Sequence, residues 1–311
     1  LHCYLVYCFD LILCRHYLGG TVVRLQLENN IFVAQIDTLG AELCSLLRKD
    51  SGEEFVWQGD ERYWAGHAPT LFPITGKLKD LRFEYNEKNY ELPPHGFAKE
   101  REFFVQSHTK TCVELVLEAD RETLRQYPFL FRFTCVFTLT AAGLAITRRV
   151  ENTGKEKMYF SVGEHLGLSL TPWGGSLENY ALVFPAAQTA WNWQLNKGLL
   201  DKKTPYLDNT DTLPLSKALF QTYGCLVLQG LSAPWVALRP VGNDRGIRVS
   251  IGGFAAMVVW SPDNDGQFVC VEPWQGLPSE ANGGYDLTQR PCILHLSSGE
   301  KYEYTVTVEP E

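Results

Sequence analysis

Short runs in which apolar and polar residues alternate recur along nearly the whole chain, and they constrain its fold more than any other feature. Between residues 131 and 139 the apolar side chains fall on one face and the polar ones mostly on the other, which is typical of a half-buried strand. No long segment repeats its apolar residues with the helical period of 3.6, which excludes βαβ units and a doubly wound sheet. The pattern predicts an all-β fold of antiparallel sheets packed as one large sandwich, with few short helices.

The length and the apolar content bound the number of domains. The 311 residues, of which 45% are hydrophobic, permit either two ordinary domains or one large all-β domain. No stretch has the composition of a domain linker. Residues 196–216 are polar and contain Pro205 and Pro214, so we predict a long loop there rather than a boundary. We therefore expect a single domain over residues 21–311.

Residues 1–20 do not fit the pattern of the rest of the chain. The first 18 are apolar and rich in Cys, but Asp10 and Arg15 interrupt them. They lack the basic start and small-residue cleavage site of a signal peptide, and the run is too short and broken for a membrane span. We expect an atypical extension outside the sandwich, either an artefact of the sequence start or an added amphipathic segment.

Charge and cysteine content narrow the classes of partner and site. The formal net charge is −8 and no dense Lys/Arg block occurs, which argues against nucleic acid and anionic membranes as partners. The nine Cys form no CxxC pair, and several lie in strand-like runs. We interpret them as small buried hydrophobes of a cytoplasmic protein, not as a disulfide framework or a zinc site. The His and carboxylates show no metal-ligand spacing, although ligands could converge from distant strands.

One stretch places a carboxylate at the end of an apolar strand. Four apolar residues, 268–271, lead directly into Glu272, which Pro273 follows. The run is typical of a strand buried on both faces, and we expect its pairing to end at Pro273 because proline cannot donate to a ladder. A carboxylate removed from water has a raised pKa, as a general base near neutral pH requires. The alternative is a strand-end Glu that faces water or pairs with an Arg.

Two histidines and several tryptophans are further candidates. His165 lies in phase on a predicted strand, and His95 lies in a loop stiffened by prolines before it and followed by Gly96. Either histidine could be purely structural. Trp64 and Trp274 lie in Gly- and Pro-rich stretches rather than in strand cores, a position suited to stacking on sugar rings, although plain packing is the commoner use of tryptophan.

Six motifs in a fixed order connect these candidates. They are Leu39-Gly40-Ala41-Glu42-Leu43, Trp57-Gln58-Gly59-Asp60, Ala68-Pro69-Thr70-Leu71-Phe72-Pro73-Ile74-Thr75-Gly76-Lys77-Leu78, His95-Gly96-Phe97-Ala98, Gly163-x-His165 and Cys270-Val271-Glu272-Pro273-Trp274-x-Gly276. Each motif alone is weak, but together they span about residues 22 to 308. In this order they resemble the aldose 1-epimerase (galactose mutarotase-like) superfamily, and more closely its short bacterial branch associated with lactose utilisation.

The resemblance implies a fold, a reaction and roles for particular residues. The implied fold is an antiparallel β-supersandwich, and the implied reaction interconverts the α and β anomers of a free hexose without cofactor or metal. Glu272 matches the general base that takes the anomeric hydroxyl proton, His165 the general acid that protonates the ring oxygen, and His95 a sugar-binding histidine. The substrate-binding residues would be Lys77, Trp274, Trp64 and Phe97. A small sugar is the expected partner, and the protein is expected to be a monomer or homodimer.

Some positions depart from the family pattern. Lys77 stands where the family usually has Arg, and it loses the bidentate fork for sugar hydroxyls. Leu166 stands where Pro often follows the acid histidine. An Asp that holds a sugar hydroxyl in the galactose enzymes has no clear match. These departures leave the identity of the sugar open.

Three alternative functions therefore stay open. An epimerase of hexose 6-phosphates would need two or more Arg near the far end of the sugar, for which Arg62, Arg82 and Arg101 are the candidates. A glycoside hydrolase would need a second carboxylate, and the neighbouring Glu164 should point away from His165 by strand alternation. A non-catalytic carbohydrate-binding protein would keep the pocket without the chemistry.

Overall fold

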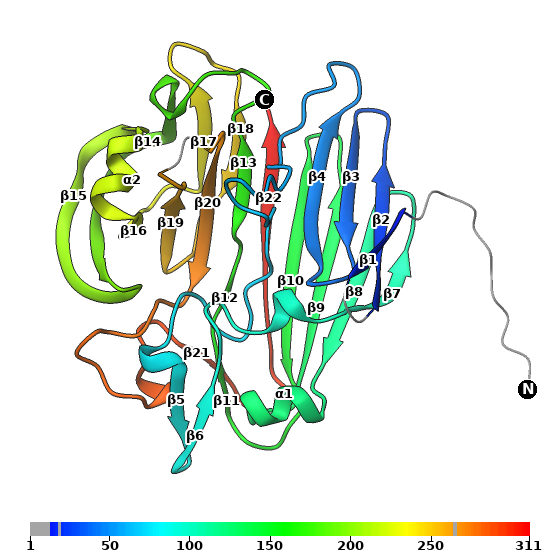
Figure 1. Cartoon of the computed structure of the whole chain (residues 1–311), viewed down its shortest axis with the longest axis vertical. Coiled ribbons are helices and arrows are strands. Elements are labelled where there is room, and N and C mark those ends of the chain that lie inside the picture. The colour runs from blue at the N-terminus through cyan, green and yellow to red at the C-terminus, as the bar shows by residue number, and fades with distance from the viewer. Residues whose placement is uncertain (1–12, 18–19, 264–265) are drawn as a thin grey trace, which may run out of the picture.

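In the computed structural model of the chain, the described residues are 13–17, 20–263 and 266–311. The chain is mostly β, with 51% of its residues in strands and 9% in helices, which confirms the predicted all-β class. The strands pair antiparallel within large sheets (Figure 1). The predicted extension lies largely outside the described residues, but its residues 13–17 form a strand that pairs with residues 20–24.

Two sheets make up most of the molecule. The smaller has the order β1-β2-β3-β4, and the larger has fourteen strands in the order β12-β20-β19-β16-β14-β17-β18-β22-β10-β9-β8-β7, with β13 also on β20 and β15 on β14. The strands of the smaller sheet are β1 (Leu13–Tyr17), β2 (Gly20–Glu28), β3 (Phe32–Asp37) and β4 (Glu42–Arg48). Those of the larger sheet are β7 (Phe104–His108), β8 (Cys112–Glu118), β9 (Phe131–Leu139), β10 (Leu144–Asn152), β12 (Val162–Gly163), β13 (Leu166–Ser169), β14 (Tyr180–Asn196), β15 (Leu199–Pro214), β16 (Cys225–Gln229), β17 (Trp235–Pro240), β18 (Ile247–Ser250), β19 (Ala256–Trp260), β20 (Phe268–Gln275) and β22 (Lys301–Pro310).

The remaining elements are short. Two further two-stranded sheets pair β5 (Arg82–Tyr85) with β6 (Lys88–Glu91), as a hairpin, and β11 (Met158–Phe160) with the sequence-distant β21 (Leu294–Leu296). The helices are α1 (Arg121–Gln126), α2 (Lys217–Tyr223) and the 3₁₀ turns η1 (Lys79–Leu81), η2 (Ala98–Glu100), η3 (Leu177–Asn179) and η4 (Leu287–Gln289). None of the helices in the described ranges has the length and apolar character that a membrane crossing demands.

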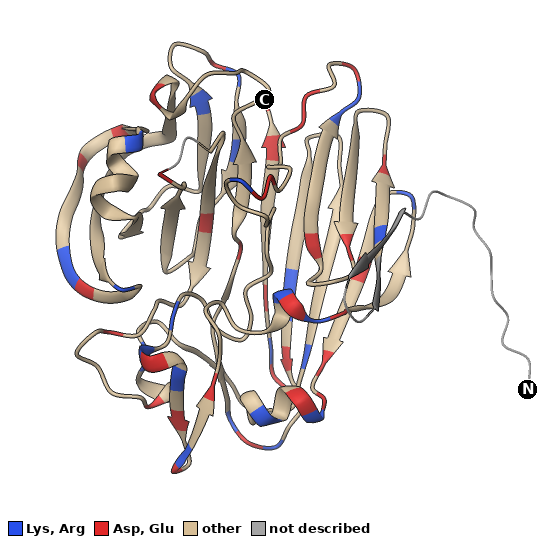
Figure 2. Cartoon of the chain, viewed as in Figure 1, with Lys and Arg blue, Asp and Glu red and all other residues tan. Residues whose placement is uncertain are grey.

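The main core lies where the smaller sheet packs against strands of the larger one (Figure 1). Leu27 and Phe32 from the smaller sheet share one buried cluster with Phe133 and Phe137 of β9. The alternation of buried and half-buried residues along β10 places every second side chain in this core. Figure 2 shows acidic and basic positions interspersed along strands and loops, mostly singly.

The stretch predicted as a long loop is a strand. Residues 199–214 form β15, which pairs with β14 in a long curved hairpin at the edge of the larger sheet (Figure 1). The polar composition misled the prediction because half of the β15 side chains are exposed and few are buried. Pro205 and Pro214 are tolerated since, among the described residues, β14 alone pairs with β15 at these two positions and the register shifts repeatedly along the hairpin.

The strand that carries Glu272 does not end at Pro273, contrary to the prediction. β20 continues to Gln275, and Pro273 lies opposite Met257 of β19. The carbonyl of Pro273 accepts the N–H of Glu164 at 3.1 Å. Since the N and C=O of one strand residue point to the same side, the missing N–H of Pro273 faces a place where the ladder is already interrupted.

That interruption holds His165. On one edge of β20, β12 pairs as far as Gly163 opposite Trp274, and β13 begins with Leu166 opposite Val271. Glu164 and His165 therefore lie between two strands, not within one as predicted, and they face Glu272 and Pro273 across the gap. Freed from the ladder, His165 can turn its side chain to the mouth of the sheet.

A buried ion pair between Arg148 and Glu164 holds the chain at this gap. Nε and Nη2 of Arg148 donate to the two carboxylate oxygens of Glu164 at 2.8 and 2.9 Å, and the hydroxyl of Tyr304 donates to the same carboxylate at 2.9 Å. Arg148 and Glu164 are each 1% exposed. The side chain of Glu164 thus points into the core and away from His165, as strand alternation predicts.

We expect Arg148→Met to lower the free energy of unfolding by about 3–5 kcal/mol, because it leaves the Glu164 carboxylate buried without its counter-charge. Adding Glu164→Leu in the same chain should recover most of that loss. Arg149→Met on the same strand, which removes only the exposed pair with Glu303, should cost less than about 1 kcal/mol. Urea unfolding measures all three. A single Arg148→Met variant as stable as Arg149→Met would contradict the anchoring role.

Candidate active site

A cavity of about 420 Å³ opens beside the gap between β12 and β13. Its walls come from the segments 64–77 and 94–99, from Pro278 and from the tip of the β14–β15 hairpin. Strands β16, β19 and β20 complete them. The lining residues are Trp64, Pro69, Gly76, Lys77, Pro94, His95, Lys99, His165, Leu195, Gly198, Cys225, Val258, Trp260, Glu272, Trp274 and Pro278. A volume of this size suits a monosaccharide-sized ligand.

Glu272 supplies the carboxylate of the cavity. It is 1% exposed and lies on β20 between apolar neighbours. Burial raises the pKa of Glu272 well above its usual value, and the nearby indole of Trp274 opposes that shift. The structure therefore confirms the predicted desolvated carboxylate. The alternatives, a Glu that faces water or one paired with an Arg, are wrong for Glu272.

His165 lies beside this carboxylate. Its Nε2 atom is 3.3 Å from Oε2 of Glu272, within ion-pair distance although not aligned as a hydrogen bond. The imidazole packs against the Trp64 ring, with centroids 5.2 Å apart and planes tilted by 31°, and against the edge of Trp260. Burial lowers the pKa of His165 to about 4. Burial thus favours the neutral forms of both members of the pair.

The loop around His95 holds that residue in one tautomer. His95 and Gly96 both have positive φ, 66° and 73°, and a Cβ on Gly96 would lie 2.4 Å from the Phe72 carbonyl oxygen. The N–H of His95 donates to the carbonyl of Gly76, and the N–H of Gly76 donates to Nδ1 of His95 at 3.3 Å. Since Nδ1 accepts, the proton of the neutral ring is on Nε2. Burial lowers the pKa of His95 well below its ordinary value, which keeps the ring neutral.

Three buried polar atoms of these residues lack a hydrogen-bond partner among the described residues: Oε2 of Glu272, Nδ1 of His165 and Nε1 of Trp274. Unpaired buried polar atoms are costly, and native proteins keep few of them. Clustered at one cavity, they indicate a site built to bind a polar ligand rather than a packed core.

Three of the four residues expected to bind substrate line the cavity, and Phe97 does not. Lys77 and Trp64 line the cavity, and so does Trp274, although it lies within β20 and not in a loop. Nζ of Lys77 donates to the Lys197 carbonyl at the hairpin tip. The expectation for Phe97 is wrong in place: its ring is 3% exposed and packs in the core against aromatic residues of the main cluster, not in the cavity wall.

Sequence reasoning missed other lining residues. Nζ of Lys99 donates to the carbonyls of Pro94 and Gly96, and so braces the loop on both sides of His95. Its position four residues after His95 was the available signal. Trp260 and Leu195 gave no signal, because neither belongs to a recognised motif and only the fold brings them to the cavity.

The residues of the alternative functions lie elsewhere. Arg62 pairs with Asp60, Arg82 stacks on Tyr285 and Arg101 faces Asp120. No arginine is among the described residues that line the cavity, and Glu272 is the only carboxylate there. A phosphate-binding wall of arginines and a second catalytic carboxylate are therefore both missing from this part of the molecule.

One donor set in the cavity could in principle hold a metal ion. Single ligand atoms of His165, Cys270 and Glu272 lie within 4.8 Å of one another. Burial raises the thiol pKa of Cys270 well above its ordinary value, so a metal would first have to displace its proton. The expectation that the site works without a metal stays a prediction.

Comparisons with known proteins show similarity over nearly the whole chain. The protein LacX (chromosomal) of Lactococcus lactis subsp. lactis is 30% identical over 303 residues, covering 92% of this chain and 99% of that protein. A galactose mutarotase related enzyme from Lactobacillus acidophilus has a similar structure, with a TM-score of 0.88 at 30% identity over 93% of this chain and 97% of its own. A galactose mutarotase-like protein from Lactobacillus casei gives a TM-score of 0.86 at 28% identity, covering 93% of this chain and 100% of its own.

These solved structures agree with the sandwich predicted from the strand pattern. A family model described as Aldose 1-epimerase matches residues 23–309, which is nearly the whole chain that follows the N-terminal segment. The match includes Glu272, His165 and His95, the three residues that converge on the cavity. The chain therefore belongs to the aldose 1-epimerase family.

Proposed function

We propose that the protein is an aldose 1-epimerase that interconverts the α and β anomers of a free hexose. Glu272 acts as general base, His165 as general acid, and His95 orients the sugar through its Nε2–H. The observation that carries the proposal is the 3.3 Å contact between Nε2 of His165 and Oε2 of Glu272, both of which line the cavity. No cofactor is needed for this chemistry.

The short distance suits the reaction because the two reacting oxygens of a sugar are bonded to the same carbon. The hydroxyl oxygen O1 and the ring oxygen O5 both lie on C1, so an acid and a base that serve them must be close neighbours. Glu272 removes the proton of O1 while His165 delivers one to O5. The C1–O5 bond breaks and C1=O1 forms, giving the open-chain aldehyde.

The second half of the reaction reverses these roles. Rotation about C1–C2 presents the other face of the aldehyde to O5. His165 then takes the proton back from the O5 hydroxyl as the ring closes, and Glu272 returns its proton to O1. Each turnover leaves the two side chains as they began, so the pair needs one shared proton and no net supply of protons.

The pKa shifts describe where that proton rests. Burial raises the pKa of Glu272 and lowers that of His165, so the empty cavity favours a protonated Glu272 beside a neutral His165. Transfer of this proton across the contact yields the carboxylate and imidazolium that the reaction uses. Sugar hydroxyls that donate hydrogen bonds to the Glu272 carboxylate favour the ionised pair. Glu272 and His165 titrate as a coupled pair rather than singly.

We expect Glu272→Gln and His165→Ala each to lower kcat/KM by at least about 10², the usual scale for loss of a general acid or base. Polarimetry on freshly dissolved α-D-glucose and α-D-galactose measures the rate above the buffer rate. Glu54→Gln and His295→Ala are matched controls, since neither residue lines the cavity, and both should keep wild-type activity.

The same assay separates an enzyme from a binder. If the wild-type protein gives no acceleration with any free hexose, while both site variants still bind sugar as the wild type does, the protein is a carbohydrate-binding protein and the proposal is wrong. Acceleration confined to hexose 6-phosphates would replace the free sugar as substrate.

The pH dependence should follow the shared proton. Below about pH 4 His165 gains the second proton and no base remains, and above the raised pKa of Glu272 the last proton leaves and no acid remains. We therefore expect no acid limb in kcat/KM as the pH is lowered to about pH 5, and an alkaline limb set by the raised pKa of Glu272. A fall in kcat/KM as the pH is lowered, centred near the ordinary histidine pKa of about 6.5, would contradict the lowered pKa of His165.

A further inference from the structure

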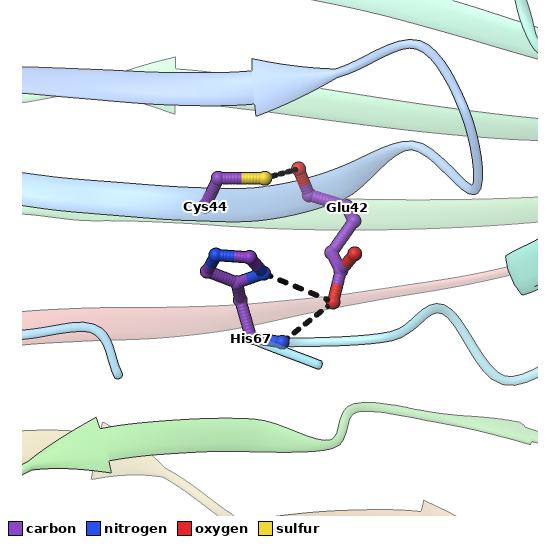
Figure 3. Close-up of side chains that lie close together, drawn as sticks. All are labelled: Glu42, Cys44 and His67. Carbon is purple, nitrogen blue, oxygen red and sulfur yellow. Dashed lines mark hydrogen bonds and ion pairs between the residues drawn. The ribbon is translucent and has the colours of Figure 1, made fainter. Parts of the chain in front are cut away.

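The motif at residues 39–43 has no part in the proposed chemistry, yet one of its side chains binds the loop that contributes Trp64 and Pro69 to the cavity wall. Oε1 of Glu42, at the start of β4, accepts the backbone N–H of His67 at 2.8 Å (Figure 3). It also accepts the backbone N–H of Ala68 at 2.9 Å. The side chain is 22% exposed, and burial raises its pKa. A single oxygen thus holds two consecutive amides of the loop that carries Trp64.

The held loop is in turn bonded to the strand that follows His165. The carbonyl of His67 accepts the N–H of Gly167 at 3.0 Å, and the carbonyl of Gly167 accepts the N–H of Trp57 at 2.8 Å. A Cβ on Gly167 would lie 2.6 Å from the His67 oxygen and 3.0 Å from the Trp64 ring. The loop and β13 therefore meet at a contact too close for any side chain, two residues beyond His165.

The same loop places the ring on which His165 rests. Nε1 of Trp57 donates to the carbonyl of Trp64 at 2.8 Å, which fixes the backbone of Trp64. The indole of Trp64 then lies 5.2 Å from the imidazole of His165. Two routes thus run from Glu42 to His165, one through the backbone of His67 and Gly167, the other through the packed ring of Trp64.

A metal site is the competing explanation for this part of the molecule. Single donor atoms of Glu42, Cys44 and His67 lie within 4.8 Å of one another (Figure 3). The hydrogen bonds favour the structural role, since Oε1 of Glu42 already accepts two amides and the Cys44 thiol donates to the carbonyl of Glu42 at 3.4 Å. The thiol pKa of Cys44 is also well above its ordinary value because of burial.

We propose that Glu42 is a positioning residue of the active site, which holds residues 67–68 so that Trp64 and β13 fix the imidazole of His165 beside Glu272. The inference rests on the proposed epimerase function for its rate effects. Glu42 touches no reacting atom, and it acts by reach and acceptor geometry rather than by charge.

Two substitutions separate reach from charge. Glu42→Gln keeps the length of the side chain and an acceptor oxygen, while Glu42→Asp keeps the charge and withdraws the oxygen by one methylene. We expect Glu42→Gln to retain kcat within about threefold, and Glu42→Asp to lose about tenfold or more in kcat with little change in KM, because a small misplacement of a catalytic group is costly. The opposite order, with Asp active and Gln inactive, would overturn the proposal in favour of a charge or a bound cation.

The matched control is Gln188→Asn. Oε1 of Gln188 likewise accepts two consecutive amides, those of Ser232 and Ala233, but none of the three lines the cavity. This variant withdraws the same acceptor by the same distance, so it should lower stability without changing kcat. An equal loss of kcat in Gln188→Asn and Glu42→Asp would reduce the effect to general destabilisation and overturn the proposal.

A titration of the His165 ring signals by NMR tests the inference without turnover. In Glu42→Asp the pKa of His165 should rise toward the ordinary value, because a displaced Trp64 admits water, and Trp57→Phe, which removes the bond to the Trp64 carbonyl, should act in the same direction. An unchanged His165 titration in both variants would overturn the proposal. If the wild-type protein proves inactive on every hexose, the proposed function fails, while this titration still decides the positioning role.

Discussion

The site depends on a break in strand pairing along one edge of β20. Because β12 stops at Gly163 and β13 starts at Leu166, two residues are released from the ladder at the point where Glu272 and Pro273 lie opposite. One of them, Glu164, is drawn into the core by Arg148, and the other, His165, is left to face the cavity. The buried ion pair and the open imidazole are thus two consequences of one local geometry.

Removal from water then sets the pKa values of Glu272 and His165, which the break in pairing brings face to face. Burial pushes the pKa of Glu272 upward and that of His165 downward, so neither group ionises readily on its own. At 3.3 Å they can exchange a single proton, and a polar ligand shifts the balance toward the ion pair. His95 is held outside this exchange, since Gly76 fixes its tautomer and burial keeps it neutral.

Much of this could be predicted from the sequence, and the failures have physical causes. Alternation along residues 131–139 predicted the sheet, and the apolar run before Glu272 predicted a desolvated carboxylate. Strand β15 was missed because alternation weakens when half of the side chains of a strand are exposed and few are buried. The strand end expected at Pro273 was wrong because a missing N–H is harmless where the neighbouring strand is itself interrupted.

The site was harder to predict than the fold, because its walls come from segments far apart in sequence. Resemblance brought His95, His165 and Glu272 together, but it also placed Phe97 at the cavity, where the fold buries it in the core. Trp260 carried no pattern of its own, and only the packing of β19 brings it to the cavity wall. A residue's role as anchor or as reactant depends on contacts that spacing does not record.

The most direct test of the central claim is a crystal structure of the protein with a bound hexose. The account expects the anomeric oxygen O1 within hydrogen-bond distance of the Glu272 carboxylate and the ring oxygen O5 within the same distance of Nε2 of His165, with His95 donating to the sugar. A hexose bound with its C1 end away from this pair, and with the contact between Glu272 and His165 undisturbed, would contradict it.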